Sequence, residues 1–375
     1  MTKIRRLDAW PVKYLEPNDD NGTRYVVMVR LTADDGTIGW GEAVTIFREA
    51  TIATAVLINE LQDVVVGHSA ESPVSLNKVL KAHMWWYGEG GLATFAVAGI
   101  DLAAWDLAGH LTNVSVVNIL GGALYDSLPV VVTTHATLAD LKAQAELIAE
   151  WVGRYSASGA KVGFGKRGDA NLGFDHGRDV QFVRSLRSAL GDGPQIMIDL
   201  GVRNSWDVAT AVRRVLDFEV YGLHWIEEPL GADDPEGYAT LRAKTTALIA
   251  YGEREWTPRG IRRILRSGTV DVVGIDAGRA EGITGFVAAC RYIEAEKRQV
   301  NAHAFAGPIS YAAGLAVSFT STACRQFEVA PLVNHLVRDF APALPRPSGG
   351  VVVPLLGPGL GVDVITDAVL ASVIA

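Results

Sequence analysis

Cysteine is scarce in this sequence of 375 residues, which contains only Cys290 and Cys324. The two lie far apart in the chain, in apolar contexts, so a disulfide framework is not expected and a reducing cytoplasm is the expected location. Continuous apolar runs of about 18 residues, the length of a membrane span, are also absent. The start of the chain is polar and carries Arg5 and Arg6, which is not the pattern of a secretory signal. No membrane partner is therefore expected.

Concentrated basic charge is also missing. Lysine and arginine total 34 against 42 aspartate and glutamate residues, which gives a net charge of -8. Since no basic cluster offers a face for phosphate groups, nucleic acid is not an expected partner. The hydrophobic fraction of 49% is enough for a large core and for more than one domain. These properties are typical of a large soluble enzyme.

The first part of the chain combines strand and helix patterns. Two apolar runs, 25–31 and 37–43, flank the turn Asp34-Asp35-Gly36 and predict a β-hairpin. Helical patterns follow in three segments, over 51–61, 74–82 and 91–110. Gly121-Gly122 and Pro129 then indicate a boundary, so we assign residues 1–125 to a first domain.

Eight apolar runs follow this boundary, separated by helical patterns. They are 130–136, 159–165, 195–199, 223–228, 247–253, 270–276, 300–305 and 324–330. Eight strand–helix units within about 220 residues have the size of a (β/α)8 barrel, which we assign to residues 126–345. An open doubly wound sheet is the alternative, disfavoured because no glycine-rich phosphate turn follows the first strand. Ser205 and Thr257 are expected to cap two of the helices.

Carboxylates end three successive runs of this set, at Asp199, Glu227 and Glu253. Neighbouring strand ends in a barrel lie about 5 Å apart, and three carboxylates that close repel one another unless a cation lies between them. Ligation by oxygen alone suits Mg²⁺ better than Zn²⁺. Glu228 follows Glu227 directly and, because strand side chains alternate, is expected to face the other way. The sequence therefore predicts one Mg²⁺ per subunit on Asp199, Glu227 and Glu253.

The next two runs end in Asp276 and His303. An aspartate on one strand can orient the imidazole of the adjacent strand and raise its basicity, so these residues are candidates for a catalytic dyad. Lys161 lies within the second run, where a lysine facing the barrel interior needs an anionic partner. His135 and His224 have nothing aligned with them and are interpreted as core residues.

The motifs, taken in order, resemble the mandelate racemase/muconate lactonizing group of the enolase superfamily. They are TADDGTIGWGEA, AGIDLAAWDLAGH with NILGG, IDLG ending at Gly201, WIEEPL, YGE, GIDAGRAEGIT, AHAFAG and VPLLGPGLGVDV. The resemblance covers nearly the whole chain. It implies an N-terminal α+β capping domain over a modified (β/α)8 TIM barrel, and a homo-oligomer.

The resemblance also implies the chemistry. Substrates of such enzymes bear a carboxylate, and Mg²⁺ stabilises the enediolate that forms when the α-proton leaves. Asp276 and His303 are implied as the base dyad, Lys161 as a cation near the substrate carboxylate, and Glu328 as a hydrogen-bonding partner of the enediolate.

Substrate choice is expected to lie in the capping loops, at residues 14–24 and 45–50. Asp19, Asp20, Arg24 and Arg48 are the polar candidates there, with Arg24 taken as a substrate-binding residue. Trp85, Trp86 and Tyr87 are expected to pack in the core rather than line the site. The last segment, 346–375, has no strand partner left in the barrel and is expected to return to the capping domain.

Two positions depart from the family pattern. Gly163 stands where racemases of the group have the second lysine of Lys-x-Lys, and Gly201 stands where many relatives have asparagine. Lys166 has the wrong parity to replace that lysine and is expected to lie beyond the strand. With one clear base, His303, the enzyme is expected to act on a single α-configuration.

One base is sufficient for β-elimination, because the imidazolium formed on His303 can protonate the departing hydroxide. The favoured function is thus dehydration of a sugar acid, an aldonate or aldarate. The alternatives are a lactone cycloisomerase, an epimerase with a second base, or a barrel that binds a metal and a sugar acid without catalysis.

Overall fold

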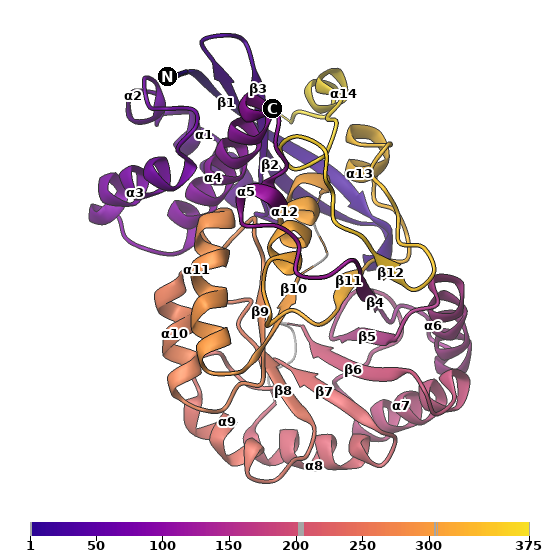
Figure 1. Ribbon diagram of the computed structural model, residues 1–375. Helices are drawn as coiled ribbons and strands as arrows, with labels where there is room; N and C mark the ends of the chain where they lie inside the picture. The colour runs from indigo at the N-terminus through magenta and orange to yellow at the C-terminus, as the bar shows by residue number, and fades with distance from the viewer. Residues whose placement is uncertain (1, 202–205, 304, 306, 375) are drawn as a thin grey trace.

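The chain folds into a small α+β domain that lies across one end of a barrel of parallel strands (Figure 1). The structure, a computed structural model, describes residues 2–201, 206–303, 305 and 307–374. The predicted fold class, a modified (β/α)8 barrel with an N-terminal capping domain, is confirmed. The boundaries at 125/126 and 345/346 stay predictions.

The capping domain contains an antiparallel sheet and a set of short helices. Its strands are β1 (Ile4–Glu16), β2 (Gly22–Ala33) and β3 (Ile38–Ala43). Its helices are η1 (Pro17–Asp19), α1 (Arg48–Asn59), α2 (Gln62–Val65), α3 (Pro73–His83), η2 (Met84–Trp86), α4 (Gly91–Thr112) and α5 (Val116–Ile119). The predicted hairpin is confirmed, since β2 and β3 pair from Val27↔Ala43 to Thr32↔Ile38.

Helix α4 is the central helix of this domain. It is long and apolar enough to cross a membrane, but 89% of its apolar window is buried inside the protein. It packs closely on β3, because a side chain on Gly41 would overlap the carbonyl oxygen of Gly99. The glycine in this strand is thus explained by the contact between helix and sheet.

The barrel strands are parallel and follow the order β10-β9-β8-β7-β6-β5-β4-β11. They are β4 (Leu128–His135), β5 (Gly159–Phe164), β6 (Gln195–Leu200), β7 (Leu223–Glu227), β8 (Leu248–Tyr251), β9 (Val272–Ile275), β10 (Gln299–Ala302) and β11 (Phe327–Val329). The bridge Val300↔Cys324 joins β10 to the segment before β11. All eight predicted runs are therefore strands of one barrel.

Helices cover the outside of the barrel. They are α6 (Leu141–Tyr155), α7 (His176–Leu190), α8 (Val208–Glu219), α9 (Pro235–Arg242), α10 (Pro258–Arg266), α11 (Gly282–Ala295), α12 (Pro308–Phe319) and α13 (His335–Phe340). Thr257 caps α10 through the amide of Gly260, as predicted. Ser205 lies outside the described residues; Asp207 caps α8 instead, accepting from the amide of Thr210.

The last segment contacts both domains. Strand β12 (Val351–Val352) pairs antiparallel with the start of β4, so the expectation that no barrel partner remains was wrong. The amide of Val116 donates to the carbonyl of Gly359 at 2.7 Å, and α14 (Thr366–Ala371) precedes a bridge between Val373 and Val12. The return to the capping domain was foreseen, whereas the pairing with β4 was not.

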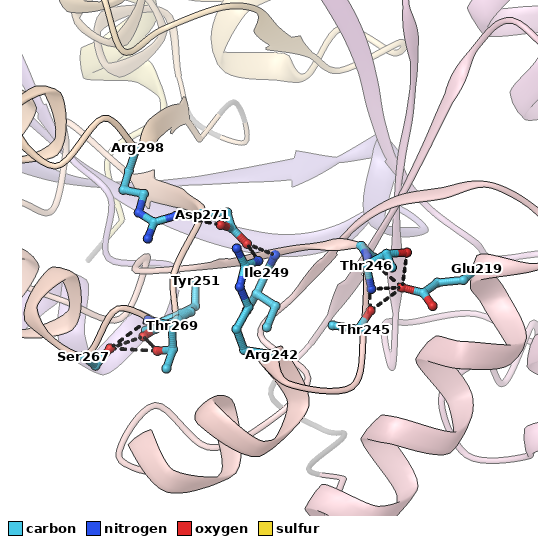
Figure 2. Close-up of polar contacts among 11 residues, drawn as sticks. Glu219, Arg242, Thr245, Thr246, Ile249, Tyr251, Ser267, Thr269, Asp271 and Arg298 are labelled. Atoms are coloured by element: carbon cyan, nitrogen blue, oxygen red, sulfur yellow. Dashed lines mark hydrogen bonds and ion pairs between the residues drawn. The ribbon is translucent and has the colours of Figure 1, made fainter.

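The interior of the barrel is packed, and its amino-terminal end is held by polar contacts. Val131, Met197, Trp225, Ala250 and Val272 form an apolar cluster inside the strands. Asp271, directly before β9, accepts from the amide of Ile249 at 3.0 Å and from Arg298 at 2.9 Å, and it also contacts Arg242 (Figure 2). Contacts at this end of a TIM barrel serve stability, which leaves the carboxyl end for chemistry.

Both cysteines are buried free thiols. The two thiols interact although they are distant in sequence. The hydrogen bond with Cys324 is the main cause that raises the pKa of the Cys290 thiol, and burial is the second cause.

Candidate active site

Strand register brings the predicted residues into one layer at the carboxyl end of the barrel. His135 pairs with Gly163, Gly163 with Asp199, and Asp199 with Glu227 across four consecutive strands. Glu253 lies two residues beyond the end of β8. Because these strands are parallel and in register, side chains far apart in sequence surround the opening at the carboxyl end of the barrel, which we call the mouth.

Two of the three predicted metal ligands, Glu227 and Glu253, border a common space. An added side chain on Gly274 would lie 3.7 Å from Glu227 Oε1 and 3.8 Å from Glu253 Cβ, so these two glutamates flank the same point. Burial raises the pKa of Glu227 to about 8; Lys161 opposes the rise, and the charges of Asp199, Glu328 and Glu253 add to it. Burial is thus the main cause of the raised pKa of Glu227, and the neighbouring carboxylates add to it.

This donor set fits Mg²⁺ by its chemistry. All three side chains offer oxygen, and their mutual repulsion is what a divalent cation relieves. Among the residues that the structure describes, no three His, Cys, Asp or Glu side chains converge closely enough to hold a metal as they stand. Glu227 is instead directed toward Lys161, with Oε2 2.9 Å from Nζ. The ligand assignment stays a prediction.

Glu228 has a partner of its own. Arg254 Nε lies 2.6 Å from Glu228 Oε2, so this carboxylate is occupied by an ion pair. Burial raises the pKa of Glu228 well above its usual value, and the nearby charge of Glu253 adds to the shift. Glu227 and Glu228 thus have different cationic partners, and the division made on strand alternation, with Glu227 as metal ligand and Glu228 as a neighbour, stays a prediction.

The predicted dyad is brought together. His303 Nδ1 lies 3.0 Å from Asp276 Oδ2, and Asp276 Oδ1 accepts from the amide of Gly278 at 2.8 Å. A carboxylate can only accept, so the proton belongs on Nδ1 and Nε2 is left as the basic atom. Burial acts to lower the pKa of His303, but the hydrogen bond and charge of Asp276 outweigh it and raise the pKa.

Lys161 and Glu328 form a buried ion pair inside the barrel. Lys161 is 2% exposed, and its Nζ lies 2.6 Å from Glu328 Oε1 as well as near Glu227. Asn301 Nδ2 donates to the same Glu328 oxygen at 2.5 Å. Glu328 Oε2 is buried and has no hydrogen-bond partner among the described residues. One carboxylate oxygen thus remains available, as a residue that hydrogen-bonds substrate requires.

His135 is the functional candidate that sequence reasoning missed. Its Nδ1 lies 2.8 Å from Asp19 Oδ1, so it pairs with a capping-domain carboxylate rather than with the core. Its ring is 5.1 Å from that of Phe305, which in turn is 6.0 Å from His303. The strand register of a barrel could have placed His135 in the same layer as Asp199. No local sequence pattern connects His135 with Asp19.

Arg24 lies at the same junction. It pairs with Asp19 at 3.0 Å and stacks over the ring of Phe305. The predicted substrate-binding residue therefore reaches the mouth, although its guanidinium already has a carboxylate partner. Residues 14–24 contain the end of β1, η1 and the start of β2 rather than an irregular loop.

The three aromatic residues after α3 are exposed, so the expectation of core packing was wrong. Trp85, Trp86 and Tyr87 are 68%, 79% and 50% exposed. Trp85 lines a cavity of about 360 Å³ together with Lys81, Glu89 and Arg259. This cavity contains none of the predicted site residues, so strand geometry rather than cavity size locates the candidate site.

The capped barrel fold and the polar residues at the carboxyl end of its strands define an enolase-type barrel enzyme. The chain matches the family described as "Enolase C-terminal domain-like" over residues 143–368. It matches "Mandelate racemase / muconate lactonizing enzyme, N-terminal domain" over residues 18–121. The chain belongs to the enolase superfamily, in the mandelate racemase/muconate lactonizing group.

Two of the similar proteins are named for reactions on sugar acids. The D-galactonate dehydratase of Ralstonia pickettii (strain 12J) is 30% identical over 90% of this chain and 88% of its own length. The 3,6-anhydro-alpha-L-galactonate cycloisomerase of Streptomyces coelicolor (strain ATCC BAA-471 / A3(2) / M145) is 29% identical over 74% of each chain. The crystal structure of an enolase from Bradyrhizobium complexed with magnesium and mandelic acid superimposes with a TM-score of 0.87, at 25% identity, over 100% of this chain and 99% of that one.

Proposed function

We propose that this protein is a Mg²⁺-dependent sugar-acid dehydratase that removes the proton α to the substrate carboxylate and then the β-hydroxyl. The observation that carries the proposal is the His303–Asp276 pair, with its 3.0 Å contact, at the mouth that Asp199, Glu227 and Glu253 surround. The dehydratase and cycloisomerase relatives support an acid-sugar substrate.

The residues of the chain would divide the work. When held by Asp199, Glu227 and Glu253, Mg²⁺ would serve as a Lewis acid toward the substrate carboxylate. His303 Nε2 takes the α-proton, and the resulting imidazolium gives a proton to the leaving β-hydroxyl, which departs as water.

Two further residues would act on the carboxylate side. Lys161 lies in the interior below this layer and contributes positive charge. The free oxygen of Glu328 would hydrogen-bond the enediolate, with the proton on the glutamate because the enediolate oxygens can only accept.

The experiment is a screen of the purified chain with Mg²⁺ against D-galactonate and other aldonates and aldarates. The keto acid product is detected as its semicarbazone, and α-proton exchange is followed by NMR in D₂O. His303→Asn should abolish both signals for the α-epimer whose proton faces His303. The matched control is His176→Asn, because His176 also pairs with an aspartate, Asp217 at 2.6 Å, but on the outside of the barrel.

Three outcomes would contradict the proposal. Wild-type-rate exchange of that same epimer in His303→Asn would assign the base to another residue. A lactone product would favour the cycloisomerase, and binding without exchange would favour a non-catalytic barrel. A cytoplasmic location and a homo-oligomer stay predictions.

A further inference from the structure

Two glycines at the barrel mouth leave room for one lysine side chain. A Cβ added to Gly163 would lie 2.7 Å from His135 Cδ2, 2.8 Å from Lys166 Cε and 3.0 Å from Lys166 Cγ. A Cβ added to Gly201 would lie 3.0 Å from Lys166 Cδ and Cε and 3.1 Å from Nζ. Neither glycine has a left-handed φ, so the backbone does not require glycine at either position. Lys166 therefore occupies the space beside Gly201, and it shares the space beside Gly163 with the ring of His135.

The chain after β5 returns Lys166 to the mouth. Gly165 has a φ of 68°, a left-handed conformation that reverses the chain just past the strand, and its amide donates to the carbonyl of Leu172 at 2.9 Å. The Lys166 side chain then lies over the ends of β5 and β6, with Nζ 3.8 Å from Asp199 Oδ2. Its side chain is 22% exposed, so Lys166 is only partly buried.

Lys166 and His303 approach the mouth from different sides. Lys166 lies over β5 and β6, whereas His303 follows β10; β4 and β11 separate β5 from β10 on one side, and β6 to β9 separate them on the other. A substrate held between them would present one face of its α-carbon to each residue.

We infer that Lys166 is the residue that contacts the substrate α-carbon from the side opposite His303, in place of the strand lysine that Gly163 lacks. The two departures from the family pattern then have one explanation. The strand lysine is missing at Gly163, Lys166 from the turn after β5 takes its place, and the glycines at 163 and 201 leave room for the Lys166 side chain. This reverses the expectation that one face of the substrate lacks a proton carrier. The inference rests on the proposed removal of an α-proton.

The proton transfer balances without another reactant. When the α-carbon–hydrogen bond breaks on one face, the electron pair moves onto the carboxylate and the proton goes to the base on that face. A proton delivered to the other face by the second group completes an exchange of α-configuration, with no atom lost and no oxidation. Both α-epimers of an active sugar acid are therefore expected to exchange in D₂O.

The kinetic test uses Mg²⁺-loaded enzyme and both α-epimers of the acid sugar found active in the screen. Lys166→Met should slow exchange of one epimer on the order of 100-fold and spare the other, and His303→Asn should do the reverse. Lys166→Arg keeps the charge near Asp199 but cannot accept a proton, so it should fail like Lys166→Met. Methylamine should restore exchange to Lys166→Ala, which a purely structural role would not allow.

A labelling test is independent of turnover. Gly163→Ala and Gly201→Asn should displace Lys166, so its acetylation rate, measured by mass spectrometry, should rise severalfold. Gly153→Ala is the matched control, because a Cβ at Gly153 meets nothing within 4 Å. If both displacing variants leave the Lys166 rate unchanged, its placement between the glycines is wrong.

The outcomes separate the two proposals. If wild-type enzyme exchanges neither epimer, both the proposed function and the proton transfer to Lys166 are overturned. The placement of Lys166 between the glycines is then tested by the labelling experiment alone. Exchange of one epimer alone, unaffected by Lys166→Met, would overturn the role of Lys166 and leave His303 as the single base.

Discussion

His135 Nδ1 and Asp19 Oδ1 lie 2.8 Å apart, and this pair joins the barrel to the capping domain at the mouth. Asp19 also pairs with Arg24 at 3.0 Å and approaches Arg167 Nε at 3.6 Å. One capping-domain carboxylate thus contacts the end of β4 and two cations. Burial would raise the pKa of Asp19, but the hydrogen bond from His135 and the charge of Arg24 outweigh it and hold the pKa well below its usual range.

The same pair predicts how stability depends on pH. Burial lowers the pKa of His135 to about 4, from 6.5, so the unfolded chain binds this proton more readily than the folded one. Stability from the neutral imidazole is present above pH 6.5 and is lost as pH falls toward 4, by at most about 1.4 kcal/mol per pH unit. His135→Gln should flatten this dependence in urea unfolding at pH 7 and 5, with His68→Gln as control. A slope as steep as that of wild type would contradict it.

The dyad predicts a shift of the acid limb of the rate profile. Proton abstraction requires neutral His303, so activity rises as pH rises through its raised pKa. Asp276→Asn removes the anion that raises this pKa, so the limb should move to lower pH while the maximal rate falls. Log kcat/KM measured against pH checks this, and a limb that stays in place would show that another group titrates.

The metal site predicts a loss of affinity that can be measured without substrate. Asp199→Asn and Glu253→Gln each remove an anionic oxygen, so Mg²⁺ binding by calorimetry should weaken by at least about tenfold. Asp217→Asn, on the outside of the barrel, should bind like wild type. Wild-type affinity in both ligand variants would place the metal elsewhere, and full activity in metal-free protein would contradict the Mg²⁺ requirement.

Lys161 predicts a combined loss of turnover and stability. Lys161→Met leaves Glu227 and Glu328 buried without their cation, so the metal-free protein should lose roughly 3 kcal/mol of unfolding free energy. Turnover should fall sharply, since charge on the substrate carboxylate is no longer opposed. Chemical denaturation and steady-state rates check both. Unchanged stability would mean that the buried ion pair is not formed in solution.

The polar contacts around Asp271 predict that removing this carboxylate lowers the stability of the protein and leaves catalysis unchanged (Figure 2). Asp271→Ala leaves Arg242 and Arg298 without their carboxylate and should lower the free energy of unfolding by roughly 3 kcal/mol. The turnover number of folded enzyme should not change, because this end of the barrel faces away from the mouth. Asp339→Ala, which removes an exposed pair with Arg338, should cost less than about 1 kcal/mol.

The sequence by itself determined the barrel and the positions of its strand-end carboxylates. Apolar runs of strand length alternate with helical patterns. Parallel strands in a barrel bring their carboxyl ends together independently of the conformation of the loops. Asp199 and Glu227 could therefore be placed at one mouth from spacing alone, and Asp276 beside His303 from the order of adjacent strands.

Only the tertiary structure decided what His135 and Lys166 contact. His135 and Asp19 are 116 residues apart and belong to different domains, so no local pattern connects them. Lys166 lies beyond the strand, as predicted, because β5 ends at Phe164; strand parity therefore does not set the direction of its side chain, and the left-handed turn at Gly165 does. Where a long side chain leaves regular structure, its position depends on the space that neighbouring strands leave open, and that space is a property of the assembled barrel.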